Sequence, residues 1–189
     1  MHLSSERGII RLVEQDAWMM DILHTAAQLG LPDWWICAGF VRSKIWDTLH
    51  GYEEPTPLPD VDVVFFDRSC TSEETEKELE ARLRLLRPEV PWSVKNQARM
   101  HAINGNPPYT SSVDAISKFP ETATALGVTL GAAGHVRLAA PCGIQDALNM
   151  LVKPTPYFAE HEQMLEVYRK RVARKNWPAQ WPRIEVTGI

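Results

Sequence analysis

Residues 60–67, Asp-Val-Asp-Val-Val-Phe-Phe-Asp, form the clearest β-strand pattern in the chain. Valine and phenylalanine favour strands, and the run begins directly after Pro59, a residue that cannot pair inside a sheet. Side chains of a strand alternate between its two faces, so Asp60 and Asp62 point the same way, about 7 Å apart along the strand. The residues between Asp62 and the end of the run are apolar on both faces. We therefore predict a buried strand that is polar only at its entrance.

The two carboxylates at that entrance predict a cation site. Two like charges on one face of a strand repel each other, so their placement suggests that a cation lies between them. The hard cation Mg²⁺, or Mn²⁺ in its place, is held by carboxylates, water and phosphate oxygens. We predict that Asp60 and Asp62 are catalytic metal ligands acting on a phosphate substrate. The structural alternative is that Asp60 ends the proline-rich loop at 52–59 and that Asp62 pairs with an arginine.

The segment before the proline-rich loop supports the phosphate interpretation. Residues 34–38 are short, aromatic and apolar, as in a buried strand that enters a tight turn at Gly39, and residues 40–49 have helical spacing. Glycine lets the backbone approach a ligand closely, and a helix N-terminus offers free N–H groups to phosphate. Arg42, in the first turn, adds a forked donor. We predict that Gly39, Phe40 and Arg42 form the phosphate side of the site.

These residues resemble the DNA polymerase beta-like nucleotidyltransferase superfamily, which pairs a glycine-containing turn and helix with Asp-x-Asp on the next strand. The matching segments are Ala-Gly-Phe-Val-Arg at 38–42 and Asp-Val-Asp-Val at 60–63. The chain is most similar to a compact bacterial nucleotidyltransferase family that also carries Trp-Asp at 46–47, the stretch at 94–101 and Phe-Pro-Glu-Thr at 119–122. It has a looser likeness to the head domain of CCA-adding enzymes.

The resemblance implies an α+β polymerase beta-like fold, with a mixed sheet flanked by helices. It implies metal-dependent transfer of an NMP group from an NTP, with release of pyrophosphate, to an unknown acceptor that is a small molecule, a protein or RNA. Phe40 replaces a second glycine or serine of the superfamily, and Ser43 replaces an aspartate of the CCA-adding enzymes. An inactive nucleotide-binding or regulatory module of the same fold therefore stays open as the alternative.

Two further questions concern residues 92–98, which we expect to form a strand beside the site. Lys95 and Arg99 are expected either to contact phosphate or acceptor, and so to join the nucleotide-binding set, or to form ordinary salt bridges. The segment has no acidic residue, although many superfamily members use a third carboxylate on a neighbouring strand. That third acid is Asp67, Asp114 or another residue brought near by folding, or it is absent.

The rest of the chain reads as one folded domain over residues 1–189, with an N-terminal helix and a C-terminal helical extension. With 44% hydrophobic residues and no long low-complexity block, the composition is that of a folded protein. The pattern predicts a hairpin within 127–139 and helices at 5–30, 72–86, 144–152 and 157–175.

The net charge and the cysteines limit which partners and which location the protein can have. A net charge of −4 argues against a wholly nucleic-acid-binding surface, so we expect no DNA partner. A basic cluster near the end keeps RNA binding open as a third hypothesis; it consists of Arg169, Lys170, Arg171, Arg174 and Lys175. The chain has no signal-like N-terminus, no apolar run long enough for a membrane span and three cysteines without paired spacing, so a cytoplasmic location is expected.

Overall fold

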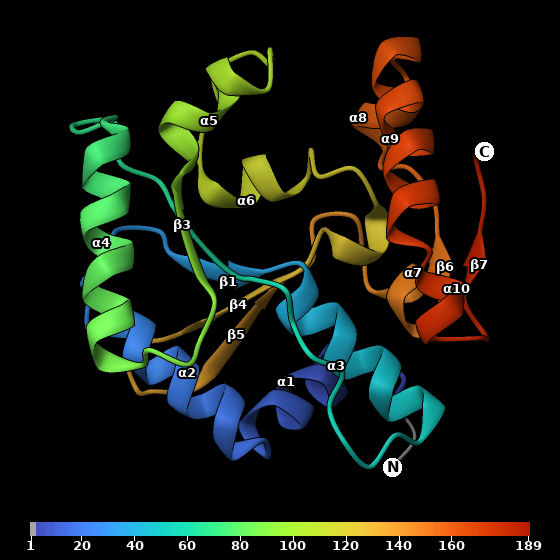
Figure 1. Ribbon diagram of the computed structural model, residues 1–189, viewed down its shortest axis with the longest axis horizontal. Coiled ribbons are helices and arrows are strands. Elements are labelled where there is room, and N and C mark those ends of the chain that lie inside the picture. The colour runs from blue at the N-terminus through green and yellow to red at the C-terminus, as the bar shows by residue number, and fades with distance from the viewer. Residues whose placement is uncertain (1–2) are drawn as a thin grey trace.

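The computed structural model of the protein describes residues 3–189 and has an α+β fold around one mixed sheet (Figure 1). The predicted fold class is confirmed. The helices and strands run as follows: α1 Glu6–Glu14, α2 Ala17–Ala27, β1 Trp35–Cys37, α3 Gly39–His50, β2 Val61–Phe65, α4 Glu73–Leu86, β3 Trp92–Asn96, α5 Gln97–Ile103, α6 Ser112–Ile116, the 3₁₀ turn η1 Thr122–Thr124, β4 Gly127–Leu130, β5 Val136–Ala139, α7 Gln145–Leu148, β6 Leu151–Val152, α8 Pro156–Ala159, α9 Glu162–Lys175, α10 Trp177–Gln180 and β7 Glu185–Val186.

The central sheet has five strands in the order β3-β2-β1-β4-β5. β2 and β3 are parallel, and the other neighbours are antiparallel. A second, two-stranded sheet pairs β6 with β7 and ties the C-terminal segment back to the residues that follow α7. Asp62 lies opposite Cys37 of β1 and Ser93 of β3, so these three side chains share one face of the large sheet.

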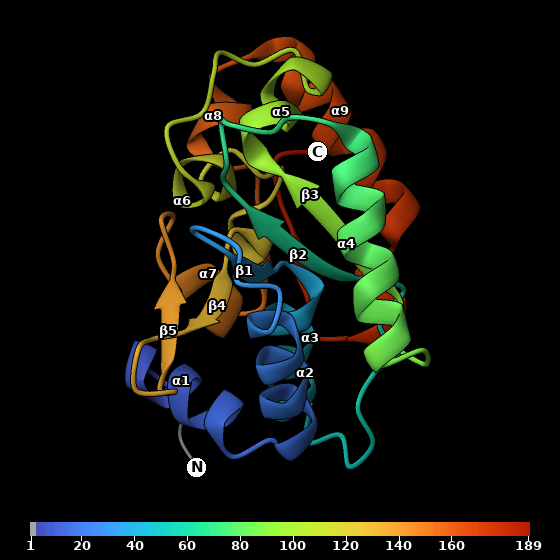
Figure 2. The ribbon, with the colours of Figure 1, turned by 90° about the vertical axis from the view of Figure 1, so that its left-hand side faces the viewer.

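The two faces of the sheet have different coverings (Figures 1 and 2). Val61, Val63 and Phe65 of β2 join the main hydrophobic core with residues of α1, α2, α3 and α4. On the opposite face, Val64 packs in a smaller cluster with residues of β1, α6 and the turn before β4. The smaller cluster extends to Cys37, the residue opposite Asp62.

Several predicted elements are interrupted in the structure, because polar side chains cap helices within them. The helix predicted at 5–30 is two helices: the carboxylate of Asp16 accepts a hydrogen bond from the amide of Met19 at 3.0 Å and starts α2. The strand predicted at 92–98 ends at Asn96, whose side chain accepts from the amide of Ala98 at 3.0 Å and starts α5.

The last two predicted helices are also shorter than expected. The helix predicted at 144–152 ends at Leu148, because the residues that follow pair as β6. The one predicted at 157–175 divides into α8 and α9. The hairpin predicted within 127–139 is confirmed as β4 and β5. No helix within residues 3–189 is both long and apolar enough to cross a membrane.

Candidate functional site

The carboxylate pair lies where β2 enters the sheet. Asp60 is exposed and directly precedes β2, whereas Asp62 is half-buried between the neighbouring strands. Burial, followed by the negative charge of Asp60, raises the pKa of Asp62 from 3.8 to about 6. A hydrogen bond with Ser93 and the charges of Arg171 and Lys175 on α9 act in the opposite direction. The fold thus exposes Asp62 to the negative charge of Asp60 and to the positive charges of two residues of α9.

The backbone between β1 and α3 is strained next to this pair. Ala38 has φ 55° and ψ −116°, a conformation that L-residues rarely adopt, and its amide donates to the carbonyl of Leu126 at 3.0 Å. The amides of Val41 and Arg42 donate to the Ala38 carbonyl, so the earlier amides of α3 have no acceptor within the helix. The unusual backbone lies at Ala38 and not, as the sequence suggested, at Gly39.

Arg42 lies in a cage of three tryptophans. Its guanidinium carbon lies 4.9 Å from the ring centroids of Trp46 and Trp177, and 5.5 Å from that of Trp181. The side chain is buried, and within residues 3–189 its Nε has no hydrogen-bond partner. Its terminal nitrogen donates to the hydroxyl of Ser43 at 3.1 Å. A buried guanidinium with an unused donor is suited to an anionic ligand.

The cage also sets the electrostatics of Arg42. Burial lowers the pKa of Arg42 to about 10, and the nearby charges of Glu121, Asp60 and Asp47 oppose that shift. The side chain is therefore a cation at neutral pH. Sequence reasoning placed Arg42 in the site but missed Trp177 and Trp181, which come from the distant C-terminal segment; the only signal was the large number of tryptophans, seven in all.

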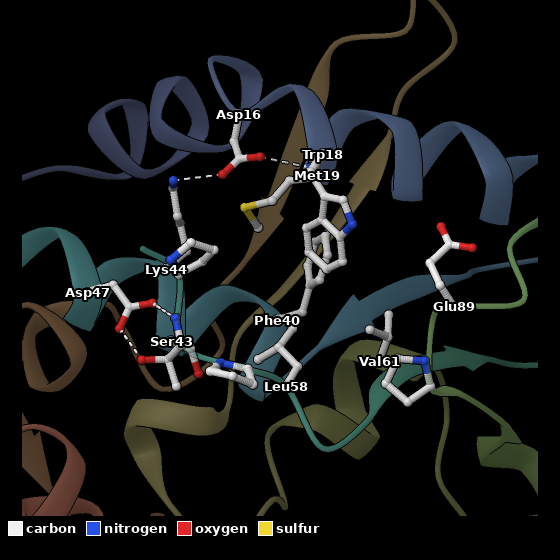
Figure 3. A pocket seen from close by; sticks show the side chains of 14 residues that line it. Asp16, Trp18, Met19, Phe40, Ser43, Lys44, Asp47, Leu58, Val61 and Glu89 are labelled. Atoms are coloured by element: carbon white, nitrogen blue, oxygen red, sulfur yellow. Dashed lines mark hydrogen bonds and ion pairs between the residues drawn. The ribbon is translucent and has the colours of Figure 1, made fainter. Parts of the chain in front are cut away.

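The side chain of Phe40 lies beside those of Trp18 and Leu58 (Figure 3). It is buried and packs near Trp18, with 5.8 Å between ring centroids, beside a cavity of about 320 Å³ that Leu58 and Val61 also line. Val61 lies on the face of β2 opposite to Asp62. Only the backbone amide of Phe40 is therefore placed to contribute to a phosphate site.

The Trp-Asp pair at 46–47 anchors the loop that carries Asp60. Asp47 accepts hydrogen bonds from the amide and hydroxyl of Thr56, at 2.8 and 2.7 Å, and from the indole of Trp181 at 2.7 Å. The indole of Trp46 donates to the carbonyl of Ala147 at 3.0 Å. One carboxylate thus fixes both the proline-rich loop and the C-terminal segment against α3.

Lys95 and Arg99 meet at a buried glutamate. Arg99 lies on α5, not on the predicted strand, and its guanidinium donates to both carboxylate oxygens of Glu76 at 3.0 and 2.7 Å. The Lys95 ammonium lies 3.6 Å from the same carboxylate. The amide of Asn96 also donates to Glu76, at 2.9 Å, so this carboxylate pairs with the exposed edge of β3. Both cations thus form salt bridges, which was one of the two alternatives predicted from the sequence. Their contact with phosphate or acceptor stays a prediction.

The basic cluster on α9 is partly neutralised. Arg171 donates from Nε to the fully buried carboxylate of Glu121 at 2.6 Å. Lys170 pairs with Glu166 at 3.3 Å, and Arg169 pairs with residues of the same helix. Residues Arg171 and Lys175 are the members of the cluster whose charge acts on Asp62. Sequence reasoning missed the Glu121–Arg171 pair, which links the helix to the turn before η1.

The two named candidates for a third carboxylate, Asp67 and Asp114, interact with other residues. Asp67 follows the far end of β2, five residues or roughly 16 Å along the strand from Asp62, and accepts from the amide of Ser69 at 2.8 Å. Asp114, on α6, forms an ion pair with Lys118. Within residues 3–189, no three histidine, cysteine or acidic side chains come together in a group that could hold a metal.

The remaining donor set still suits Mg²⁺. This ion binds through one or two carboxylates and keeps water or substrate phosphate oxygens as its other ligands. Asp60 and Asp62 supply the carboxylates, and the hydroxyl of Ser93 lies beside Asp62. The amides at the start of α3 and the caged Arg42 supply groups for an anion that would share the ion.

Fold and site together define the class of the protein, an α+β nucleotidyltransferase. A family model described as nucleotidyltransferase matches residues 24–186, and the chain belongs to that family. A protein whose NMR structure is described as revealing a CCA-adding enzyme head domain is 38% identical, with a TM-score of 0.87, over 97% of this chain and 96% of that one. The resemblance stated from the sequence is confirmed.

Complete CCA-adding enzymes share the fold at much lower identity. One determined in complex with CTP is 10% identical, with a TM-score of 0.61, over 95% of this chain and 43% of that enzyme. The Thermotoga maritima enzyme in complex with tRNA is 12% identical, with a TM-score of 0.59, over 95% and 42%. The chain therefore spans less than half the length of these enzymes. A search of curated proteins gave no match.

Proposed function

We propose that the protein transfers an NMP group from an NTP to an acceptor hydroxyl and releases pyrophosphate. The observation that carries the proposal is the meeting of the Asp60–Asp62 pair with the start of α3 and the caged Arg42. A divalent cation held by the two carboxylates would neutralise phosphate charge and activate the α-phosphorus. The nucleotidyltransferase family of the chain supports the reaction class.

The protein's own groups would act mainly by positioning and by charge. Asp62, with a pKa of about 6, is predominantly ionised at neutral pH and available as a ligand. The amides of Gly39 and Phe40, with Arg42, bind the outer phosphates. The acceptor oxygen forms its bond to the α-phosphorus as the bond to the bridging oxygen of pyrophosphate breaks, and the acceptor proton passes to solvent.

The test is a screen for pyrophosphate release with each NTP, Mg²⁺ or Mn²⁺, and pools of small-molecule, protein and RNA acceptors. Asp60→Asn and Asp62→Asn are expected to lower turnover at least a hundredfold. Asp67→Asn is the matched control, because it removes a carboxylate from the opposite end of the same strand. Turnover by Asp62→Asn equal to that of the wild type would contradict the proposal.

One observation favours a second candidate, a nucleotide-binding module without transfer. Ser93 stands directly opposite Asp62 on β3, and in residues 3–189 no third acidic group completes a metal cluster. Calorimetry with NTP and Mg²⁺ separates the two candidates. Metal-dependent binding without pyrophosphate release from any acceptor pool would favour the module, and pyrophosphate release would exclude it.

A further inference from the structure

A second cavity, of about 400 Å³, lies between the α5–α6 segment and the α8–α9 segment. Figures 1 and 2 both place α5, α8 and α9 at the same end of the molecule. The volume is within the range of roughly 300 to 1,000 Å³ that small-molecule sites occupy. The cavity is lined by Gln97, Asn104, Asn106, Tyr109, Ala115, Lys118, Phe119, Pro120, Phe158, Gln163, Met164 and Val167.

Helix α9 connects this cavity with the carboxylate pair. Val167, Arg171 and Lys175 follow at intervals of four residues, so they lie along one face of the helix. Val167 lines the cavity, whereas Arg171 and Lys175 act on the charge of Asp62. With a rise of about 1.5 Å per residue, Val167 lies about 6 Å along the helix from Arg171. The same helix face borders both the cavity and the site.

The sheet also connects the cavity with the carboxylate pair. Asp62 and Val64 share one face of β2, and Val64 belongs to the hydrophobic cluster against which Phe119 packs. Phe119 in turn lines the cavity. On the neighbouring strand, Lys95 lies opposite Val64, and Gln97, two residues on, lines the cavity. The cavity therefore lies on the same face of the sheet as Asp62, beyond the hydrophobic cluster around Val64.

The lining combines flat apolar surfaces and neutral hydrogen-bonding groups with one cation, Lys118, whose ammonium lies 5.4 Å from the centre of the Tyr109 ring. Tyr109, Phe119 and Phe158 supply aromatic rings, and four carboxamides complete the wall: Gln97, Asn104, Asn106 and Gln163. Within the part of the chain that the structure describes, no carboxylate lines the cavity. Aromatic rings stack on planar ligands, and a carboxamide presents both a donor and an acceptor.

Two of these groups are held in place by a network across the cavity. Asn106 donates to the hydroxyl of Tyr109 at 2.6 Å and accepts from the hydroxyl of Tyr157 at 2.9 Å. Tyr157 lies on α8, so the network joins the two walls. Gln97 is buried at the start of α5, and Gln163 is exposed on α9. Gln163 is thus the carboxamide most readily changed without disturbing the fold.

We propose that this cavity binds the nucleobase of the NTP and that its carboxamides select the base. The inference rests on the proposed function, since that function places the triphosphate at Arg42 and the α-phosphorus at Asp62. A planar, neutral base with donors and acceptors along its edge matches the rings and carboxamides of the lining, and the cavity lies on the Asp62 face of the sheet. An acceptor molecule in this position is the competing occupant.

The test measures binding without turnover, by calorimetry with Mg²⁺. The ligands are the four NTPs and inorganic tripolyphosphate, which has the charge of the nucleotide without its base. Val167→Trp should fill the cavity from the exposed face of α9 and weaken the best-bound NTP at least tenfold, while tripolyphosphate affinity changes less than twofold. Glu166→Trp, the same bulk on the preceding exposed residue, should leave both affinities within twofold.

A second variant removes recognition without adding bulk. Gln163→Ala should reduce the spread of dissociation constants among the four NTPs at least threefold and leave tripolyphosphate binding unchanged. Wild-type NTP affinity in both variants would overturn the inference, and it would assign the cavity to the acceptor if pyrophosphate release fell. Equal weakening of NTP and tripolyphosphate would also overturn it. Wild-type protein that binds neither ligand would instead refute the proposed function.

Discussion

Asp62 is held by the fold in an environment that opposes its charge. Burial beside Asp60 raises its pKa from 3.8 to about 6, so the folded protein binds a proton more tightly than the unfolded chain. Between these two values the stability of the metal-free protein must fall as pH rises, because the folded state then loses a proton that it held more strongly. The cost of burying this negative charge disappears when a bound cation neutralises it or when a neutral side chain replaces the carboxylate.

We therefore expect Asp62→Asn to be more stable than the wild type in metal-free buffer at pH 7. The difference should be on the order of 1 to 3 kcal/mol and should disappear below about pH 4. Urea unfolding at a series of pH values measures it. Asp67→Asn should give no such gain, because hydrogen bonds with Ser69 lower the pKa of Asp67. A variant at position 62 that is less stable than the wild type at pH 7 would contradict the burial argument.

Arg42 illustrates a second feature at the residue scale, a cation whose geometry depends on stacking. A lysine keeps the charge but lacks the planar group that fits between tryptophan rings and binds phosphate in a forked manner. We expect Arg42→Lys to weaken tripolyphosphate and NTP binding about tenfold. Arg137→Lys is the matched control, since Arg137 also lies over a tryptophan, Trp35, at 5.8 Å. Equal affinities for Arg42→Lys and Arg137→Lys would remove Arg42 from the phosphate site.

At the scale of elements, the hydrogen bond from Trp181 to the buried carboxylate of Asp47 is one of several that latch the C-terminal segment to α3. Trp181→Phe keeps an aromatic ring over Arg42 but removes the donor to Asp47. Loss of a buried donor to a charged group costs roughly 1.5 to 3 kcal/mol, and we expect destabilisation of that size in urea. Trp18→Phe, a change at a ring that is 42% exposed, should cost much less. Similar losses for both variants would show that the latch contributes little.

The helices and strands that could be predicted from the sequence are those with a recognisable local pattern of residues. The strand that follows Pro59, the charged helix at 73–86 and the hairpin of β4 and β5 each carry their own period and their own turn residues. Two of the boundaries that failed depend on caps. Asp16 and Asn96 end an expected element because their side chains bond the backbone of the next helix, and hydrophobic periodicity does not show where such a bond forms.

The same distinction holds for the candidate site. Asp60, Asp62 and Arg42 could be predicted because each lies in a short segment with a recognisable spacing. Ser93 and Arg171 reach Asp62 only through strand pairing and helix docking. The tryptophan cage is the extreme case, since the Trp181–Asp47 hydrogen bond joins residues 134 positions apart. Contacts of that range leave no periodic signal in the sequence.

At the scale of the whole molecule, the two ends of the chain share one core. The main cluster runs from Leu3 through the sheet to Trp177, Trp181 and Ile184 without a break. The β6–β7 pair and the latch at Asp47 add polar links between the C-terminal segment and the rest. The prediction of one domain can therefore be tested as cooperativity.

We expect the protein to unfold in a single transition, because no part of the shared core can open without exposing the rest. Urea unfolding followed by far-ultraviolet circular dichroism reports helices throughout the chain, and tryptophan fluorescence reports the three tryptophans of the cage around Arg42 together with the four elsewhere in the chain. The two midpoints should coincide within error. Addition of tripolyphosphate with Mg²⁺ should raise both midpoints together, since a ligand of the folded state stabilises the whole unit. A fluorescence transition that precedes the loss of helix would show that the C-terminal segment unfolds separately from the sheet.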